Sequence, residues 1–190
     1  SGVHSNGYTL VRAVVERSGC SLEDPCPFDP SHPSREIESF SGAEAHPTLA
    51  EVLLNPTRIY VDPVVDLVLE SRREGGVVGP DSIKAIAHIT GGGLSNLLRL
   101  HDSLGWHIDS PLEPQPEFEW LSEVGSVTPV EMHRTFNMGM GMVIAVSEGS
   151  SDAVEEWVRN RLPGSRRVGR VVENGRLVTH SNPDVAFSHY

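Results

Sequence analysis

The chain has 190 residues, 38% of them hydrophobic and 22% charged, which suits one folded globular domain with a substantial core. The formal net charge of −11 argues against a general nucleic-acid-binding protein and against binding to anionic membrane surfaces, because both partners require a basic face. No apolar run approaches the ~20 residues that would be needed to cross a bilayer.

Hydrophobic periodicity and turn residues predict helices that alternate with strands along the whole chain. Helices are expected over 8–17, 48–54, 63–73, 94–101, 118–124, 129–136 and 151–161. Extended segments are expected over 59–61, 85–89, 106–108 and 142–146, and a closing hairpin is expected to pair 168–172 with 176–178. The stretch 20–47 is rich in Pro, Ser, Asp and Glu and is expected to form a long surface loop.

This alternation predicts an α/β fold of the α+β type, with a mixed β-sheet covered by helices in a single domain. The domain is expected over residues 1–180, followed by a loose C-terminal tail over 181–190. Cys20 and Cys26 lack the spacing of a zinc site, so reduced thiols and a cytoplasmic location are expected.

A cluster of three glycines forms the most informative local pattern. A strand-like run through His88 leads to Thr90, Gly91, Gly92 and Gly93, and a helix-like segment follows at once. Glycines allow close approach and positive φ, and the start of a helix presents unpaired N–H groups. The pattern therefore indicates a site for an anion, most often a phosphate, although a tight turn without a ligand explains it equally well. No Lys-Ser or Lys-Thr follows, so this is not a P-loop.

Four segments in order carry a family resemblance: His4-Ser-Asn-Gly-Tyr8, Pro56-Thr-Arg-Ile-Tyr60, His88-Ile-Thr-Gly-Gly-Gly93 and Arg134-Thr-Phe-Asn-Met-Gly-Met-Gly-Met142. Together they resemble the C-terminal half of the phosphoribosylformylglycinamidine cyclo-ligase family, also called aminoimidazole ribonucleotide synthetases. The resemblance runs from about residue 1 to about residue 177. Several segments in order are far more specific than any one alone.

The resemblance implies an ATP-dependent ligase of purine (IMP) biosynthesis that forms a C–N bond and converts formylglycinamidine ribonucleotide to aminoimidazole ribonucleotide. ATP activates the formyl-amide oxygen as a phosphate ester, the amidine nitrogen attacks that carbon, and phosphate leaves. Two rivals remain: another ATP-dependent synthetase of the same superfamily, and a non-catalytic binding domain with the same fold. The intact Arg134–Asn137 segment argues against the first, and the intact His88–Gly93 segment against the second.

Family members also carry an N-terminal domain ahead of the His4 segment, with a nucleotide-binding loop and magnesium-binding aspartates, and this sequence shows no counterpart. The chain is therefore expected to be one piece of a longer protein and inactive by itself. ATP and Mg²⁺ are expected to be held mainly by the absent domain, since metal-ligand spacing is missing here. The resemblance further implies a homodimeric parent, with much of the dimer contact made by its N-terminal domain.

His88 is the predicted catalytic residue, as a general acid or base or as a group facing phosphate, while the pattern alone also fits a histidine that shapes the turn. The residues predicted to bind substrate or phosphate are His4, Ser5, Asn6, Arg58, Tyr60, Thr90, Gly91, Gly92, Gly93, Asn137 and Gly139. Asn6 also fits simple turn chemistry, and Arg58 a surface ion pair with Glu51 or Asp62. The methionines at 138, 140 and 142 are expected to pack, and the arginines after residue 158 to be solvated charge.

Overall fold

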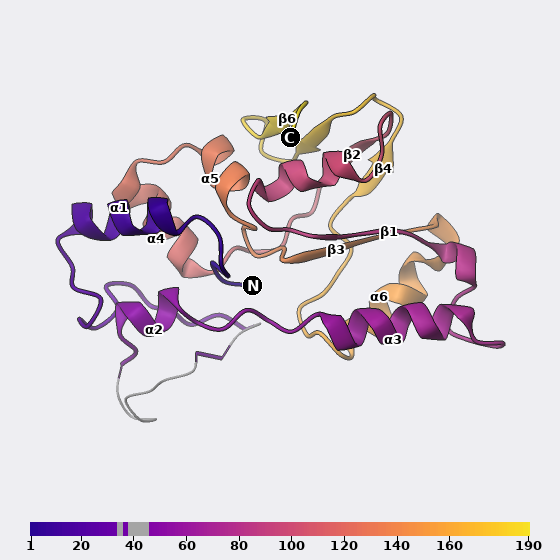
Figure 1. The fold of residues 1–190 in the computed structure, drawn as a ribbon, viewed down its shortest axis with the longest axis horizontal. Helices are drawn as coiled ribbons and strands as arrows, with labels where there is room; N and C mark the ends of the chain where they lie inside the picture. The colour runs from indigo at the N-terminus through magenta and orange to yellow at the C-terminus, as the bar shows by residue number, and fades with distance from the viewer. Residues whose placement is uncertain (34–35, 38–45) are drawn as a thin grey trace.

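The computed structural model describes residues 1–33, 36–37 and 46–190 (Figure 1). The α-helices are α1 (Tyr8–Ser18), α2 (Leu49–Leu53), α3 (Val61–Arg72), α4 (Pro116–Gly125), α5 (Pro129–Thr135) and α6 (Ser151–Arg159). The 3₁₀ helices are η1 (Pro80–Ser82), η2 (Gly93–Arg99) and η3 (Glu148–Ser150). The strands are β1 (Ile83–His88), β2 (Gly105–Ile108), β3 (Met142–Val146), β4 (Arg170–Val172), β5 (Val178–His180) and β6 (Ala186–Phe187).

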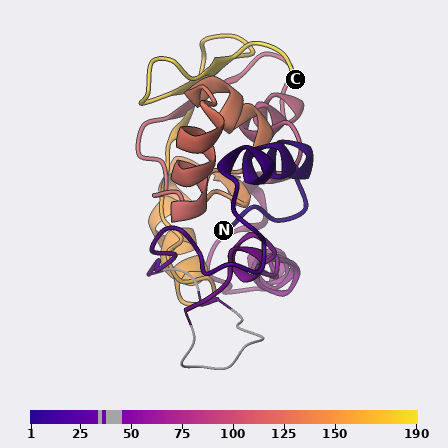
Figure 2. The same cartoon turned by 90° about the vertical axis from the view of Figure 1, so that its left-hand side faces the viewer.

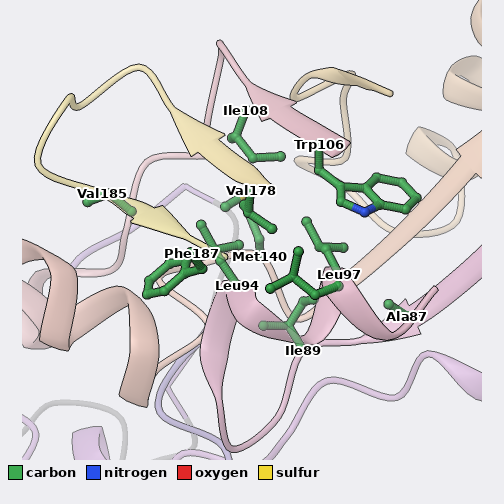
Figure 3. Packing of buried hydrophobic residues seen from close by; sticks show 11 residues of the cluster. Ala87, Ile89, Leu94, Leu97, Trp106, Ile108, Met140, Val178, Val185 and Phe187 are labelled. Carbon is green, nitrogen blue, oxygen red and sulfur yellow. The ribbon is translucent and has the colours of Figure 1, made fainter. Parts of the chain in front are cut away.

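The strands form two sheets, and the predicted α/β fold with mixed strand directions is confirmed. Strands β1 and β3 pair antiparallel, with His88 opposite Met142. The second sheet has the order β4-β2-β5-β6, in which only β2 and β5 run parallel. The main core lies between these sheets and η2, where Ile89, Leu97 and Val178 are fully buried (Figure 3).

The predicted hairpin over 168–178 is wrong, because β2 lies between β4 and β5. The connection after β4 passes close over the first residue of β2, where a Cβ on Gly105 would lie 2.8 Å from the Gly175 carbonyl oxygen. The Trp106 N–H then donates to the Leu177 carbonyl oxygen over 2.8 Å. A glycine at the start of β2 thus lets the connection cross, and the Asn174-Gly175 turn joins strands that are not neighbours.

The expectation of a loose tail over 181–190 is also wrong. Residues Ala186 and Phe187 form β6, which pairs with β5. Val185 and Phe187 are 1% and 2% exposed within the main core (Figure 3). This short apolar segment has no period of its own, so its burial follows from the exposed edge of β5 beside it.

Most of the predicted helices are confirmed. One predicted extended segment and one predicted helix differ from the structure. Thr48 and Glu51 form a capping box that starts α2, since each side chain binds the backbone N–H of the other residue. The segment 59–61 is not a strand, because α3 already begins at Val61. The helix expected over 94–101 is the seven-residue 3₁₀ helix η2.

The predicted loop 20–47 is described only in part, because residues 34–35 and 38–45 lie outside the described residues. In the described part, Pro25 forms an isolated β-bridge with Thr48.

Two further apolar clusters support the parts that flank the core. Val11 and Val14 of α1 pack in one cluster with Phe118 of α4 and Phe136 after α5. Figure 2 shows the indigo helix α1 beside the orange helices of this part of the molecule. This cluster anchors the N-terminal segment that carries His4. The other cluster joins α3 to α6.

Candidate functional site

The glycine turn after β1 is braced from inside by two side chains. Buried Asn96 donates from its amide to the carbonyl oxygens of Gly91, over 3.1 Å, and of Gly93, over 2.8 Å. The Ser95 hydroxyl donates to the Gly92 carbonyl oxygen over 2.7 Å. Within the described part of the chain, the N–H groups of Gly91 and Gly92 have no acceptor. Because η2 is a short 3₁₀ helix, these two N–H groups, rather than a helix dipole, are the donors that the turn presents.

Three aromatic rings from distant segments meet at the end of β1. The ring centroid of His88 lies 6.1 Å from that of His4 and 5.8 Å from that of Tyr60, and the His4 and Tyr60 centroids are 6.1 Å apart. Three of the four segments that carry the family resemblance supply these rings. The structure thus brings together predicted site residues that lie more than eighty positions apart in the sequence.

Gly141 supplies the space in which these rings meet. A Cβ on Gly141 would lie 2.2 Å from Tyr60 Oη and 2.6 Å from His4 Cε1. The Gly141 carbonyl oxygen accepts from the N–H of Ile89 over 2.9 Å, which fastens this residue beside the end of β1. Gly141 belongs to the fourth segment that carries the family resemblance, so this segment lies directly against the rings of His4 and Tyr60.

His4 is a buried imidazole with hydrogen-bonding capacity to spare. It is 8% exposed and has a φ of 60°, and neither ring nitrogen has a hydrogen-bond partner among the described residues. The pKa of His4 is lowered to about 4, first by burial and then by the N-terminal ammonium group and by His88. A neutral ring at physiological pH can offer one donor and one acceptor to a ligand.

The other predicted residues near the turn differ in exposure. His88 and Ser5 are exposed, while Asn6 and Thr90 are half-buried. The Asn6 side-chain oxygen lies 3.6 Å from the position that a Cβ on Gly91 would take. Asn6 therefore stands beside the turn, which agrees with a ligand-facing role and does not require one.

Asn137 holds the N-terminal segment in place. Its amide nitrogen donates to the Gly2 carbonyl oxygen over 2.7 Å, and its amide oxygen accepts from the Gly139 N–H over 2.8 Å. The Gly139 carbonyl oxygen accepts from the Ser1 amino group over 3.0 Å. Asn137 is 2% exposed, so its observed contacts are those of a residue that positions His4 rather than of one that meets solvent.

Arg58 and Tyr60 both line a groove. Arg58 donates to the Pro163 carbonyl oxygen over 2.9 Å, while Glu51, one of its two suggested ion-pair partners, belongs to the capping box of α2. Tyr60 is 9% exposed, its hydroxyl contacts the Ser1 hydroxyl, and burial raises its pKa.

The groove itself has a volume of about 1200 Å³ and is distinct from the glycine turn. Tyr60, Gly139 and Gly141 line it, and Arg58 and Arg170 are among its basic lining residues. The glycine turn and His88 are not among its lining residues. Two neighbouring surfaces therefore flank the rings, one built of backbone N–H groups and one with arginines.

Three residues of this region were not predicted. Ser95 and Asn96 brace the turn. Their positions, two and three residues after the last glycine, are the one signal in the sequence that could have found them. Tyr190 approaches the turn from the C-terminal end, with its hydroxyl donating to the Gly91 carbonyl oxygen over 3.4 Å and the Arg99 guanidinium 5.1 Å from its ring centroid. A segment expected to be loose gave no reason to place Tyr190 here.

The methionines and arginines largely follow expectation. Met138 and Met140 are buried in apolar clusters. Arg159 and Arg170 form exposed ion pairs with acidic neighbours. Arg176 instead donates to the Leu98 carbonyl oxygen over 3.0 Å. In the described ranges, no three His, Cys, Asp or Glu residues are grouped so as to hold a metal ion, and no helix has the length and apolar character to span a membrane.

The family model described as "AIR synthase related protein, C-terminal domain" matches residues 1–182. With the glycine turn, the three rings and the α/β fold in place, this match shows that the chain belongs to the AIR synthase related family and carries its C-terminal domain.

Curated relatives give the family a particular enzyme. The phosphoribosylformylglycinamidine cyclo-ligases of Methanosarcina acetivorans and Methanosarcina mazei are each 40% identical to this chain over 175 residues. These residues cover 92% of this chain and 43% of each relative. That of Methanopyrus kandleri is 39% identical over 180 residues, or 95% of this chain and 44% of the relative. The chain thus spans less than half the length of these relatives.

Proposed function

We propose that this domain binds the phosphorylated ligand of an ATP-dependent cyclo-ligase that converts formylglycinamidine ribonucleotide to aminoimidazole ribonucleotide in de novo purine biosynthesis. Family membership and the names of the relatives support this activity for a full-length protein. Within the chain, the observation that carries the proposal is the braced glycine turn beside the rings of His4, Tyr60 and His88. The N–H groups of Gly91 and Gly92 in this turn have no acceptor among the described residues.

The glycine turn and its neighbours are the proposed phosphate site. The N–H groups of Gly91 and Gly92 can donate to phosphate oxygens, with the Thr90 hydroxyl and the Asn6 amide as further donors. A ribonucleotide phosphate and a phosphate under transfer present the same oxygens, so the same turn suits either. Ser5 is exposed next to Asn6 in the sequence, Gly93 is the buried last glycine of the turn, and Arg58 lines the adjoining groove.

His88 is the proposed proton-transfer residue. Ring closure requires a group that accepts a proton from the attacking amidine nitrogen, and the exposed imidazole of His88 lies beside the proposed phosphate site, where a ligand can reach it. The buried, neutral His4 can hold the ligand by one hydrogen bond, while Asn137 and Gly139 keep the His4 segment in position. If His88 instead faces phosphate, its replacement should weaken ligand binding more than it slows turnover.

The remaining components belong to the longer protein. ATP supplies the phosphoryl group that activates the formyl-amide oxygen, and Mg²⁺ accompanies its phosphates. The described residues do not fit a magnesium site, so we assign ATP and Mg²⁺ mainly to the part of the protein that precedes this domain in its relatives. We further propose a cytoplasmic, homodimeric parent enzyme and no turnover by the 190 residues alone.

The test is a calorimetric titration of the chain with aminoimidazole ribonucleotide, in which His88→Ala should weaken binding by about ten-fold, as expected for one lost hydrogen bond to a charged group. His46→Ala, at an exposed histidine in the loop before α2, is the matched control and should bind as the wild type does. If the chain does not bind, the titration is repeated on a full-length protein. Absence of binding there contradicts the proposal that this domain holds the phosphorylated ligand. Equal binding by His88→Ala contradicts a hydrogen bond from His88 to the ligand's phosphate and leaves proton transfer as its role.

A further inference from the structure

The segment after β5 carries the side chain of Tyr190 onto the glycine turn. Its course is fixed by Phe187 of β6, which is 2% exposed in the main core. A Cβ on Gly92 would lie 2.8 Å from Cε2 of Tyr190, and the Tyr190 hydroxyl donates to the Gly91 carbonyl oxygen over 3.4 Å. The family model ends its match at residue 182, so Tyr190 adds to the turn a side chain from outside the matched region.

Arg99, near the end of η2, contacts the same ring. Its guanidinium carbon lies 5.1 Å from the ring centroid of Tyr190, which is the range of a cation–π contact. Figures 1 and 2 both show the C-terminus close to the pink helix η2. Arg99 is exposed, and it takes part in none of the ion pairs of the described residues. Asp102, the acidic residue nearest to it in the sequence, is thus not paired with it either.

The 3₁₀ form of η2 directs Arg99 to the side of the helix on which Asn96 lies. Side chains three residues apart eclipse one another in a 3₁₀ helix, and Asn96 and Arg99 have this spacing. Asn96 faces the turn, because its amide donates to the carbonyl oxygens of Gly91 and Gly93. Arg99 therefore stands one helical turn beyond Asn96 on the side of η2 that faces the glycines.

A phosphate on the glycine turn needs a charged donor that the turn itself does not provide. The N–H groups of Gly91 and Gly92 are neutral donors, and Arg58 belongs to the adjoining groove. Hydrogen bonds from a charged donor to phosphate are roughly twice as strong as neutral ones, and a guanidinium can bind two oxygens through its planar fork. Arg99 has this chemistry, and its one observed side-chain contact is a ring that touches the turn.

We propose that Arg99 is the cationic residue of the phosphate site on the glycine turn, and that Tyr190 is a positioning residue whose ring holds the Arg99 guanidinium beside that site. The inference rests on the proposed function, and it adds to it a charged ligand-binding side chain and a contribution from the C-terminal segment. The ligand class is a phosphate monoester, such as the ribonucleotide of the proposed reaction.

Calorimetric titration of the 190-residue chain with aminoimidazole ribonucleotide tests the role of Arg99. Arg99→Gln should weaken binding by about ten-fold, because a hydrogen bond from a charged donor to phosphate is lost. Binding by the wild type should also weaken more than binding by Arg99→Gln when NaCl is raised from about 50 mM to about 500 mM, because salt screens the lost charge. Arg72→Gln is the matched control, since Arg72 is an exposed arginine of α3, and it should bind as the wild type does.

Three variants test the positioning role of Tyr190. Tyr190→Ala should weaken binding by about two-fold to five-fold, the change expected for one exposed cation–π contact. Tyr190→Phe keeps the ring and should bind as the wild type does. Tyr190→Ala combined with Arg99→Gln should bind no more weakly than Arg99→Gln alone, because the ring acts through Arg99. Thermal unfolding of each variant confirms that the fold is kept.

The outcomes separate this inference from the proposed function. Wild-type binding that Arg99→Gln leaves unchanged overturns the inference while the proposed function stands. Tighter binding by Tyr190→Ala would show that the ring obstructs the turn, and weaker binding by Tyr190→Phe would show that the hydroxyl matters, so either result overturns the positioning role. If the chain does not bind, the titrations are repeated on a full-length protein, and absence of binding there contradicts the proposed function and the inference with it.

Discussion

At the scale of single residues, Gly141 determines how closely His4 and Tyr60 approach the end of β1. A Cβ at this position would overlap both rings, so Gly141→Ala should separate them and lower the affinity for aminoimidazole ribonucleotide by about ten-fold or more. The free energy of unfolding should fall by only about 1–3 kcal/mol, as is usual for overpacking. Calorimetry and urea unfolding measure the two effects. Gly149→Ala is the matched control, because nothing lies within 4 Å of its added Cβ, and equal affinity in both variants would show that the rings do not form the ligand site.

The candidate site could be predicted from the sequence only as far as its local patterns reach. His88, Thr90 and the glycines follow one another in the chain, so their strand–turn arrangement was visible. His4 and Tyr60 were predicted from the family resemblance, and the sequence held no information on their distance from His88. Asn96 was missed because its role depends on carbonyl groups that turn toward it in three dimensions.

At the scale of elements, β6 joins the C-terminal segment to the core. Phe187 is 2% exposed, so Phe187→Ala should lower the free energy of unfolding by about 3–5 kcal/mol through loss of apolar burial and the cavity that remains. Tyr190→Ala, at a side chain that is 61% exposed, should change it by no more than about 0.5 kcal/mol. Urea unfolding of both variants measures the difference, and equal stability would mean that β6 does not pack as the structure shows.

The elements that were predicted well carry signals within a few residues of themselves. The capping box of Thr48 and Glu51 starts α2, and Pro129 opens α5. The order β4-β2-β5 could not be predicted from local patterns. A turn sequence such as Asn174-Gly175 indicates that the chain bends there, but it does not indicate that β2 lies between β4 and β5. The same limit applies to β6, which pairs with β5, a strand whose edge is left open by that order.

At the scale of the whole molecule, buried or half-buried histidines lie at two places where separate segments meet. His4 is buried within the N-terminal segment, and half-buried His180 of β5 lies against half-buried His133 of α5 with ring centroids 4.8 Å apart. The pKa of His180 is lowered to about 4, by burial and then by His133 and His107, and burial also lowers the pKa of His133. Each of these rings is neutral in the folded protein at a pH where the unfolded chain already takes up protons.

This difference predicts a loss of stability in mild acid. Above the ordinary histidine pKa of 6.5 both states are neutral and the histidines contribute no pH dependence. As the pH falls from 6.5 toward about 4, the unfolded state binds more protons than the folded state, so the free energy of unfolding decreases until the folded rings also protonate. Urea unfolding across this range measures the slope. His4→Gln and His180→Gln should each make this slope shallower than in the wild type. A wild-type slope in both buried variants would mean that neither ring is held neutral by the fold.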